Sequence, residues 1–393
     1  MKKLISSFMV LLLVAVFSYS ANAAPGDLFV QIDLRDSPDV VTDQCSILKV
    51  RPNGTFTEFV SFTDILALTG LDNCDMDKTG IAIADNRDVY FSEDQSDSII
   101  KATPDGDLST FVTEAQITAL TGSGTADLEY GMVIGPDGDL YFTDEQSDFL
   151  LKATIPGGAV SVVLTEDQIA AVTGNAGADL QGGIAFDCVG NLYITDSQDS
   201  DSNDGSILIL TPEGDLSIFV TEQEIEDVTG SAVDLDRAMT FFDSLFVNDD
   251  KDCDCVIKIT LDGDISVFIP ESQITAVTGN DSADLDGGIA INQLQDVFLG
   301  DDGDSPDAPN ILMSNPNGSN LSIFVSTQEL RDFYTPPFNH PRLKGSMAFE
   351  GVDACLVTEG IPTLSEWGLI AMAGVLGIVG LLVLAIRRRK AVV

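Results

Sequence analysis

The sequence predicts an all-β protein in which one four-stranded unit is repeated around a ring. A segment with the same order of apolar runs and turns recurs six times, at a spacing of about 52 residues. Each copy holds four short, strand-like runs separated by tight turns and ends in a short helical segment. A period of this size with four strands per copy is typical of a β-propeller with one blade per copy. We therefore expect a six-bladed β-propeller with short helices between the blades.

Residues 1–23 have the pattern of a secretory signal peptide. Lys2 and Lys3 precede an apolar stretch over residues 8–17, and Ala21-Asn22-Ala23 forms a small-residue cleavage site. A membrane anchor fits less well, because the apolar stretch is short and the cleavage site follows it directly. We expect the mature chain to be exported.

The blade is clearest between residues 131 and 174. Its four predicted strands cover residues 132–134, 140–143, 149–154 and 160–164, and Pro136-Asp137-Gly138 forms the first turn. Thr165 and Gln168 form a capping box at the start of the helix, and Gly174 follows its end. The same helix start recurs at Ser61, Thr113, Thr165, Thr221 and Ser326, with Pro270 as the exception.

The two ends of the repeated region are out of phase. The mature chain begins with a second strand at residues 28–30, whereas residues 346–349 match the first strand of a blade at residues 183–186. We expect the C-terminal strand to complete the N-terminal blade and close the ring, which removes an unpaired sheet edge. The propeller should span residues 24–355.

The C-terminal region has a different character. A linker and motif over residues 356–367 precede an uncharged run at 368–386 and a basic tail at 387–393. The run is long enough to span a bilayer as a transmembrane helix, and the tail should stay cytoplasmic. The motif resembles the IPTL-CTERM type of exosortase sorting signal through residues Ile361, Pro362, Thr363, Leu364, Ser365, Glu366, Trp367 and Gly368. This resemblance implies a Gram-negative bacterium, an inner-membrane precursor held by its C-terminal helix, and processing by an exosortase-type enzyme.

A second resemblance rests on the blade motifs. Gly-Ile-Ala-Ile, Leu-Tyr-Phe-Thr-Asp and Lys-x-Thr-Pro-x-Gly are similar to motifs of the six-bladed propellers of the NHL-repeat and gluconolactonase (regucalcin)-like superfamily. That superfamily includes lactonases, esterase-like hydrolases and binding modules, so the resemblance implies the fold and leaves the activity open.

The charge balance excludes some partners. The chain has 63 Asp and Glu against 19 Lys and Arg, a formal net charge of −44. Nucleic acid and anionic lipid headgroups are excluded as partners, whereas divalent cations, basic proteins and a saline environment are compatible with this charge. Solubility alone would also explain an acidic surface.

Cysteine and histidine give few candidate sites. We expect a disulfide between Cys45 and Cys74, which both fall in predicted loops of the first repeat. Cys253 and Cys255 have a spacing that suits neither zinc nor an easy disulfide. The single histidine, His340, lies in a Pro-rich predicted loop, so a histidine metal site and a Ser-His triad are excluded. We assign no catalytic residue.

Acidic residues form the remaining candidate sites. The carboxylate that ends the second strand repeats from blade to blade, which indicates a structural role, at Glu93, Asp144, Asp196, Asp249 and Asp301. The position nearest the expected channel mouth varies between blades, as a binding surface would, at Lys78, Glu129, Gln181, Asp236, Asp286 and Lys344. Glu129, Asp236 and Asp286 are candidate Ca²⁺ ligands. The lactonase resemblance implies a metal-binding glutamate at Glu129, but the matching asparagines are missing.

An enlarged loop forms a second calcium candidate. It contains alternating oxygen ligands followed by Gly205, at Asp199, Asp201, Asn203 and Asp204. The glycine comes one place late and no Glu stands at the twelfth position, so a solvated acidic loop is the alternative.

Three functions fit these observations. The leading hypothesis is an exported binding module, secreted or displayed on the surface, with a polysaccharide or a protein as its extracellular ligand. The alternative is a Ca²⁺-dependent hydrolase of the lactonase or esterase type. The third is a structural component of the matrix or envelope without a discrete ligand.

Overall fold

The computed structural model describes residues 26–35, 44–198, 204–303, 308–334, 340–352 and 355. The predicted signal peptide, loop residues Asp199, Asp201 and Asn203, the sorting motif and the apolar run at 368–386 lie outside these residues. Within the described part of the chain, no helix is long and apolar enough to cross a membrane.

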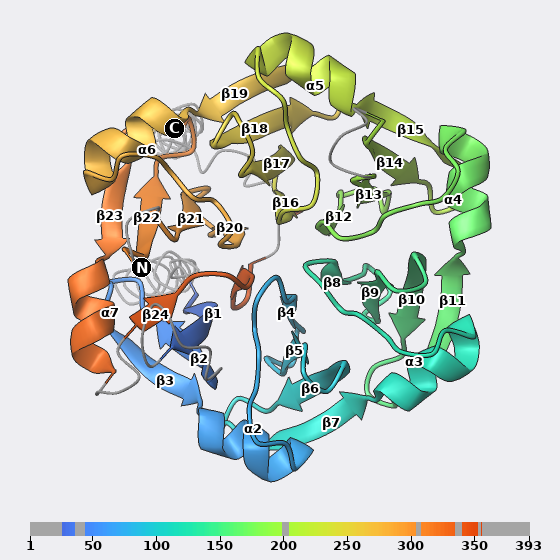
Figure 1. The fold of residues 1–393 in the computed structure, drawn as a ribbon, viewed down its shortest axis with the longest axis horizontal. Coiled ribbons are helices and arrows are strands. Elements are labelled where there is room, and N and C mark those ends of the chain that lie inside the picture. Colours follow the sequence, from blue (N-terminus) through green and yellow to red (C-terminus); the bar gives the residue numbers. More distant parts are fainter. Residues whose placement is uncertain are drawn as a thin grey trace, which may run out of the picture. The chain divides into compact units, whose positions relative to one another are not determined.

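The described strands form six antiparallel sheets arranged around a central axis (Figure 1). This confirms the predicted six-bladed β-propeller. Five sheets have the order first, second, third and fourth strand, and the sheet of the N-terminal blade has five strands. The complete blades run from β4 to β7, β8 to β11, β12 to β15, β16 to β19 and β20 to β23.

The strand bounds, grouped by their place in the blade, are as follows. The first strands, which lie at the axis, are β4 (Ile81–Ile83), β8 (Met132–Ile134), β12 (Ile184–Phe186), β16 (Met239–Phe241), β20 (Ile289–Ile291) and β25 (Met347–Phe349). The second strands are β1 (Leu28–Arg35), β5 (Val89–Glu93), β9 (Leu140–Asp144), β13 (Leu192–Asp196), β17 (Ser244–Asp249) and β21 (Val297–Asp301). The third strands are β2 (Gln44–Val50), β6 (Ser98–Ala102), β10 (Phe149–Ala153), β14 (Ser206–Leu210), β18 (Cys255–Thr260) and β22 (Asn310–Ser314). The fourth strands are β3 (Phe56–Val60), β7 (Leu108–Val112), β11 (Val160–Leu164), β15 (Leu216–Thr221), β19 (Ile265–Ile269) and β23 (Ser322–Val325).

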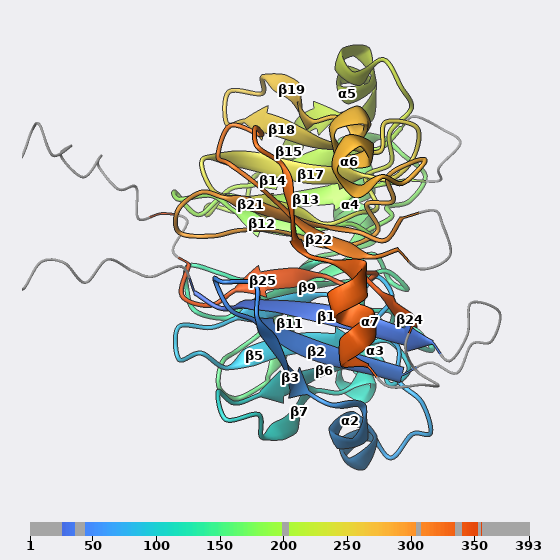
Figure 2. The same cartoon turned by 90° about the vertical axis from the view of Figure 1, so that its left-hand side faces the viewer.

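The ring closes as expected, through the C-terminal strand. β25 pairs with β1 and brings Met347 opposite Val30. A further short strand, β24 (His340–Arg342), pairs with the other end of β1 (Figure 2). The expectation that His340 lies in a loop is therefore wrong: the extra length of β1 offers unpaired backbone groups to a second segment, and these groups are satisfied by pairing.

A short helix follows the fourth strand of each blade at the rim (Figure 1). These helices are α2 (Phe62–Thr69), α3 (Glu114–Thr121), α4 (Glu166–Thr173), α5 (Glu222–Thr229), α6 (Glu271–Thr278) and α7 (Thr327–Phe333). The predicted cap at Thr165 is confirmed, with Gln168 accepting from the Thr165 amide at 3.0 Å, and Pro270 is the exception among the N-caps. Gly174 ends α4 at φ 82°, a conformation that favours glycine.

The core lies within and between the blades. The second and third strands carry mostly buried side chains, whereas the fourth strand, as in β7, is exposed at two consecutive residues and ends in a buried one. In five blades of the described chain, an aromatic ring of the second strand meets one of the fourth strand edge to face, with centroids about 5 Å apart, as in Tyr90–Phe111 at 4.7 Å. Such pairs fix each outer strand to its blade.

The cysteines among the described residues are all disulfide-bonded. Cys45 and Cys74 are joined with their Cα atoms 5.7 Å apart, and Cys45 lies in β2, not in a loop. Cys253 and Cys255 are also joined, with Cα atoms 5.1 Å apart. The interpretation that their spacing disfavours a disulfide is wrong, because residue 254 adopts a positive φ of 44° that turns the two side chains toward each other.

Candidate functional site

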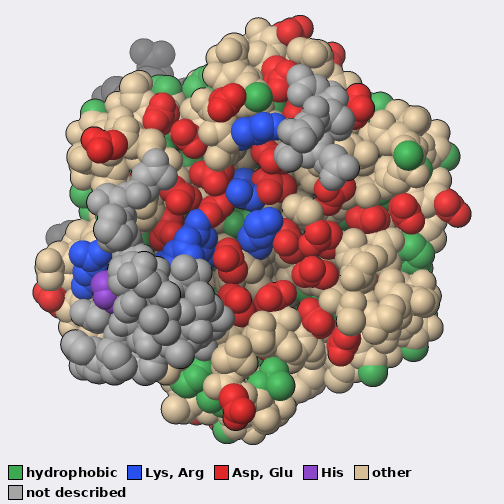
Figure 3. All heavy atoms as spheres, in the orientation of Figure 1, with side chains coloured by type: hydrophobic (Ala, Val, Ile, Leu, Met, Phe, Trp, Pro, Cys, Tyr) green, Lys and Arg blue, Asp and Glu red, His purple; other side chains and the backbone are tan. Residues whose placement is uncertain are grey.

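One face of the ring gathers the candidate residues, and we call it the mouth face. It is made by the loops that enter each first strand and by those that leave each second strand. Acidic side chains surround the centre of this face, with a few basic side chains among them (Figure 3). The face is therefore polar and carries both signs of charge at the axis.

The repeated carboxylate at the end of the second strand supports this face from below. It accepts the backbone amide of the loop that enters the first strand of the same blade. The five bonds are Glu93 to Asp75 at 3.1 Å, Asp144 to Asp127 at 2.8 Å, Asp196 to Asp179 at 2.8 Å, Asp249 to Asp234 at 2.7 Å and Asp301 to Asp284 at 3.0 Å. The position acts as scaffold, which agrees with its structural interpretation. The common partner is the preceding loop, although Glu93 also accepts two amides of the following turn.

Inside this scaffold, charged residues from several blades meet at the axis. We call Lys78, Glu129, Asp236, Arg237, Asp286 and Lys344 the axial network. The Lys78 ammonium lies 3.6 Å from Glu129 Oε1 and 3.8 Å from Asp236 Oδ2, so it connects carboxylates of two other blades. Gln181, the remaining member of the variable ring, turns away and donates to Glu145 at 2.7 Å.

Arg237 is the centre of the network. Its guanidinium contacts Asp236, lies 2.8 Å from Asp286 Oδ1, and is 3.2 Å from Asp250 Oδ2. Burial opposes its charge, but the surrounding carboxylates outweigh this effect and raise the pKa of Arg237. Arg237 therefore stays charged and joins two neighbouring blades.

Lys344 is the second cation that pairs with Asp286, and it also lies close to two other carboxylates. Its ammonium contacts Asp286 and lies 3.5 Å from Asp284 and 3.6 Å from Asp302. Asp302 also accepts from Arg342 Nε at 3.0 Å. Each of the predicted calcium ligands Glu129, Asp236 and Asp286 thus has a cation beside it. The structure brings the three around one axis, with Lys78 and Arg237 between them.

Tyr130 closes the axis beneath the network. It follows Glu129, is only 3% exposed, and its hydroxyl donates to the carbonyls of Asp286 and, at 3.0 Å, Lys344. The equivalent position in another blade is Gly345, where a Cβ would lie 2.7 Å from the Met76 carbonyl. Sequence reasoning missed Tyr130 and Arg237. The signal was the break in the repeat one position after the variable ring, where the other blades carry Thr or Gly.

A second group of carboxylates lies beside Glu129. Asp127, Glu129 and Glu145 place oxygen atoms within 4.8 Å of one another. Burial raises the pKa of Glu129 to about 9, with Lys78 opposing the shift and Glu145 adding to it. Burial also raises the pKa of Asp127 to about 7, and the charge of Glu145 adds to this shift. At neutral pH Glu129 therefore keeps a proton that an exposed carboxyl would release.

The carboxylate groups that could bind a metal ion differ in how many cations of the chain already lie beside them. Asp250, Asp284 and Asp286 also lie within 4.8 Å of one another, but Arg237 and Lys344 already balance their charge. Among the described residues, Lys78 is the cation that pairs with the group of Asp127, Glu129 and Glu145. In the enlarged loop, Asp204 presents its backbone carbonyl to Asn175 at 3.1 Å, and its predicted companions lie outside the described residues.

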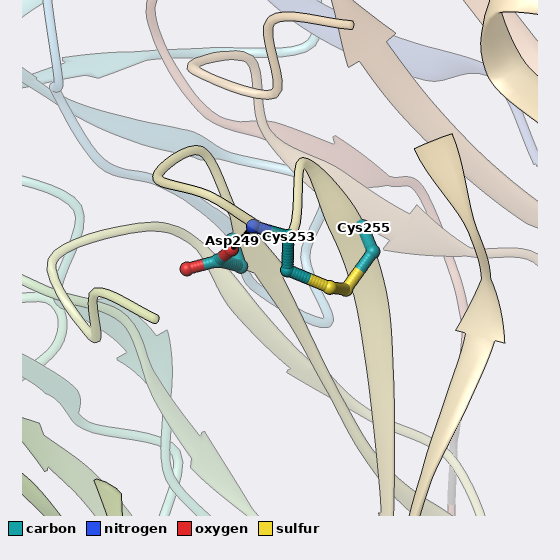
Figure 4. A group of neighbouring side chains, drawn as sticks. All are labelled: Asp249, Cys253 and Cys255. Atoms are coloured by element: carbon teal, nitrogen blue, oxygen red, sulfur yellow. Dashed lines mark hydrogen bonds between the residues drawn. A yellow bond between two sulfur atoms is a disulfide. The ribbon is translucent and has the colours of Figure 1, made fainter. Parts of the chain in front are cut away.

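A third group combines a carboxylate with two sulfurs. Asp249 places an oxygen within 4.8 Å of the sulfurs of Cys253 and Cys255. Figure 4 shows the disulfide joining the loop to the start of β18, with Asp249 beside the backbone nitrogen of Cys253, which donates to it at 3.2 Å. Because both sulfurs are used in the disulfide, they are not thiolate ligands in this state.

Fold and site together define a six-bladed β-propeller with a charged mouth, and three solved structures are similar to it. A nidogen/laminin complex matches at 14% identity over 81% of this chain and 97% of that chain, with a TM-score of 0.51, which shows the fold alone. A virginiamycin B lyase from Staphylococcus aureus matches at 17% identity over 76% and 88%, with a TM-score of 0.46. A gluconolactonase from Xanthomonas campestris matches at 12% identity over 67% and 82%, with a TM-score of 0.46.

The C-terminal region matches a known sorting motif. Residues 360–390 match the IPTL-CTERM motif, as the sequence predicts. The motif implies export to the cell surface and processing by an exosortase-type enzyme. No curated protein is detectably similar to the whole chain in sequence.

Proposed function

We propose that this protein is an exported β-propeller that binds a partner through its mouth face. The observation that carries the proposal is the axial network, in which each central carboxylate is held by a cation of the chain. These ion pairs between blades hold the central carboxylates in place, so the mouth face presents an ordered, charged surface. An ordered, charged surface of this kind supports a binding role, with a protein or a polysaccharide as the ligand.

The charge of the mouth face narrows the choice of partner. Acidic side chains surround the axis, and several have a raised pKa, including Asp97 and Asp148, at about 7 each. A positively charged partner would relieve the repulsion among these carboxylates, whereas an anionic polymer would add to it. We expect a basic protein segment or a saccharide that carries amino groups.

The test uses polymers of defined charge. Immobilised protein is exposed to polylysine, neutral dextran and alginate, and binding is followed at increasing salt. Polylysine should bind, with an affinity that falls steeply with ionic strength. Asp94→Asn with Asp179→Asn should weaken this binding. A matched variant on the opposite face, Glu213→Gln with Asp262→Asn in the turns between third and fourth strands, should not. Equal loss in both variants would contradict binding at the mouth face.

The tail supports delivery by sorting. In this proposal the apolar run at 368–386 spans the inner membrane of the precursor with its C-terminus cytoplasmic, and Ile361 to Gly368 are recognised by the processing enzyme. Mass spectrometry of the protein recovered from the cell surface should find residues 369–393 absent. Recovery of an intact C-terminus from a strain with the processing enzyme would contradict this part of the proposal.

The hydrolase alternative depends on calcium near Glu129. Asp127, Glu129 and Glu145 place oxygen atoms within 4.8 Å of one another, which favours a cation there, and bound calcium would oppose the raised pKa values of Asp127 and Glu129. A melt with calcium and with EDTA separates the alternatives: a rise in melting temperature that is lost in Glu129→Gln supports a metal site. Hydrolysis of a lactone panel would then support an enzyme, and no hydrolysis would support the binding module.

A further inference from the structure

The loop between β17 and β18 holds a disulfide that the proposed function does not use. Cys253 and Cys255 are separated by one residue, Asp254, whose φ of 44° lies in the left-handed region. Cys255 begins β18 and is 1% exposed, whereas Cys253 lies in the loop and is half-buried (Figure 4). Cys255 therefore belongs to an apolar core cluster, and Cys253 packs against this cluster but is the more exposed of the two residues.

This disulfide contributes little to the stability of the fold. A cross-link stabilises mainly by restricting the unfolded chain, and the effect grows with the length of the closed loop. The sequence separation is 2 for Cys253–Cys255 and 29 for Cys45–Cys74. Cys45 and Cys74 are also fully buried in an apolar cluster, so a thiol reaches them only after the structure opens. The short bridge should open while the propeller stays folded.

The charges of the loop affect which small thiols can approach the Cys253–Cys255 disulfide. The loop and its flanks carry Asp249, Asp250, Asp252 and Asp254, against Lys251 in the loop and Arg237, which lies 3.2 Å from Asp250. Asp252 is exposed. A negatively charged thiol is repelled by this group and a positively charged one is attracted, and salt screens both effects.

We propose that Cys253–Cys255 is a site of thiol–disulfide exchange that prefers neutral or cationic thiols. The thiolate of the partner attacks Sγ of Cys253 and forms a mixed disulfide with it. The bond to Cys255 breaks, its electron pair passes to the Cys255 sulfur, and this sulfur takes a proton from water. Cys255 remains beside Cys253 and can reverse the step, which expels the partner thiol and restores the bridge.

The experiment measures which cysteines open in the folded, full-length protein. The protein is incubated without denaturant with 2-aminoethanethiol, 2-mercaptoethanol or 2-sulfanylethanesulfonate, then alkylated and mapped by mass spectrometry. Each rate is divided by the rate of the same thiol with a small neutral disulfide, which removes differences in intrinsic reactivity. Cys253 and Cys255 should be labelled at thiol concentrations at least about tenfold below those that label Cys45 and Cys74. The normalised rates should fall from the cationic to the anionic thiol, and added salt should reduce the spread.

Two variants sharpen the test. Cys253→Ser with Cys255→Ser should melt close to the unchanged protein, which shows that the bridge is not needed for folding. Asp252→Asn with Asp254→Asn should bring the three thiols closer in rate, and Asn tolerates the left-handed backbone at 254. Opening of the Cys253–Cys255 and Cys45–Cys74 disulfides at the same thiol concentration would overturn the proposal. An anionic thiol that reacts as fast as the cationic one would overturn the charge preference.

Discussion

Arg237 shows how a single side chain links two blades. It contacts Asp236 and Asp250 of its own blade and Asp286 of the next, and only 14% of its side chain is exposed. Removing one partner of a buried charge network leaves the others uncompensated, which costs more than the network contributes as a whole. The residue therefore has a structural role at the centre of the mouth face.

Arg237→Met should lower the free energy of unfolding by about 3 kcal/mol at neutral pH, because Asp236, Asp250 and Asp286 each lose a cation contact. The loss should shrink at acidic pH, because burial raises the pKa of Asp250 and this carboxyl then takes up a proton and no longer needs the cation. Urea denaturation at two pH values measures both effects. Lys258→Met is the control: its partner Asp243 is 63% exposed, so the change should cost less than about 1 kcal/mol. A loss of equal size at both pH values would contradict the assignment.

Glu129 predicts a pH dependence of stability. Burial raises its pKa from 4.5 to about 9 in the folded protein. A carboxyl with a raised folded pKa binds its proton more tightly in the folded state, so its stabilising contribution is present at low pH and is lost as the pH rises from about 4.5 to about 9. Stability should therefore fall across this range.

Glu129→Gln should flatten this decline, because Gln does not ionise. Urea midpoints at several pH values between 5 and 9 measure the slope, and the variant should be more stable than the unchanged protein at the alkaline end. Glu213→Gln, at an exposed turn, should leave the slope unchanged. An unaltered slope in Glu129→Gln would show that other groups cause the decline.

At the scale of the element, each blade uses one carboxylate to connect its loops. Asp144 ends β9, accepts the Asp127 amide at 2.8 Å and the Ser147 hydroxyl, and is fully buried. It therefore places Asp127 and, two residues later, Glu129 at the mouth. The repeated residue is scaffold, and the residues it positions differ between blades.

Asp144→Ala should destabilise the protein by about 1 to 3 kcal/mol, because it leaves a buried amide without its acceptor. Asp144→Asn keeps one acceptor oxygen and should lose less. Thermal unfolding of the two variants gives the comparison, and both should also weaken polylysine binding if the scaffold positions the mouth. Equal losses in both variants would indicate that charge, not the hydrogen bond, is what matters at this position.

At the scale of the whole molecule, closure joins the two ends of the ring. β25 supplies the first strand of the N-terminal blade and pairs along β1 from Leu28 to Val30. Without it, the backbone groups of β1 on that side would be unpaired and the contacts of β25 with β20 and β4 would be lost. Closure therefore involves three neighbouring blades.

A chain that ends after residue 345 should melt at least about 10 °C below one that ends after Cys355, because it loses β25 and its contacts. The longer chain, residues 24–355, should unfold in a single transition, as expected for one domain. Calorimetry of the two chains measures both temperatures. Equal melting temperatures would show that β25 does not hold the ring together.

The number of blades, the helix caps and ring closure were predictable from the sequence. The strands of the blade at residues 131–174 were placed within a residue of their ends, because turn residues and apolar runs act between near neighbours in the chain. β24 was missed because a strand with Pro341 at its centre has no alternating pattern to find.

The axial network could not be predicted, although the variable ring containing most of its members was. Glu129, Asp236 and Asp286 could face either a metal ion or a cation of the chain itself. The outcome depends on side chains from other blades, which lie about 50 residues or more away in a repeat of this period. The repeat pattern of the sequence by itself determined which residues reach the mouth. Only the tertiary structure decided how they pair, because electrostatic attraction depends on distances across the axis that no local pattern contains.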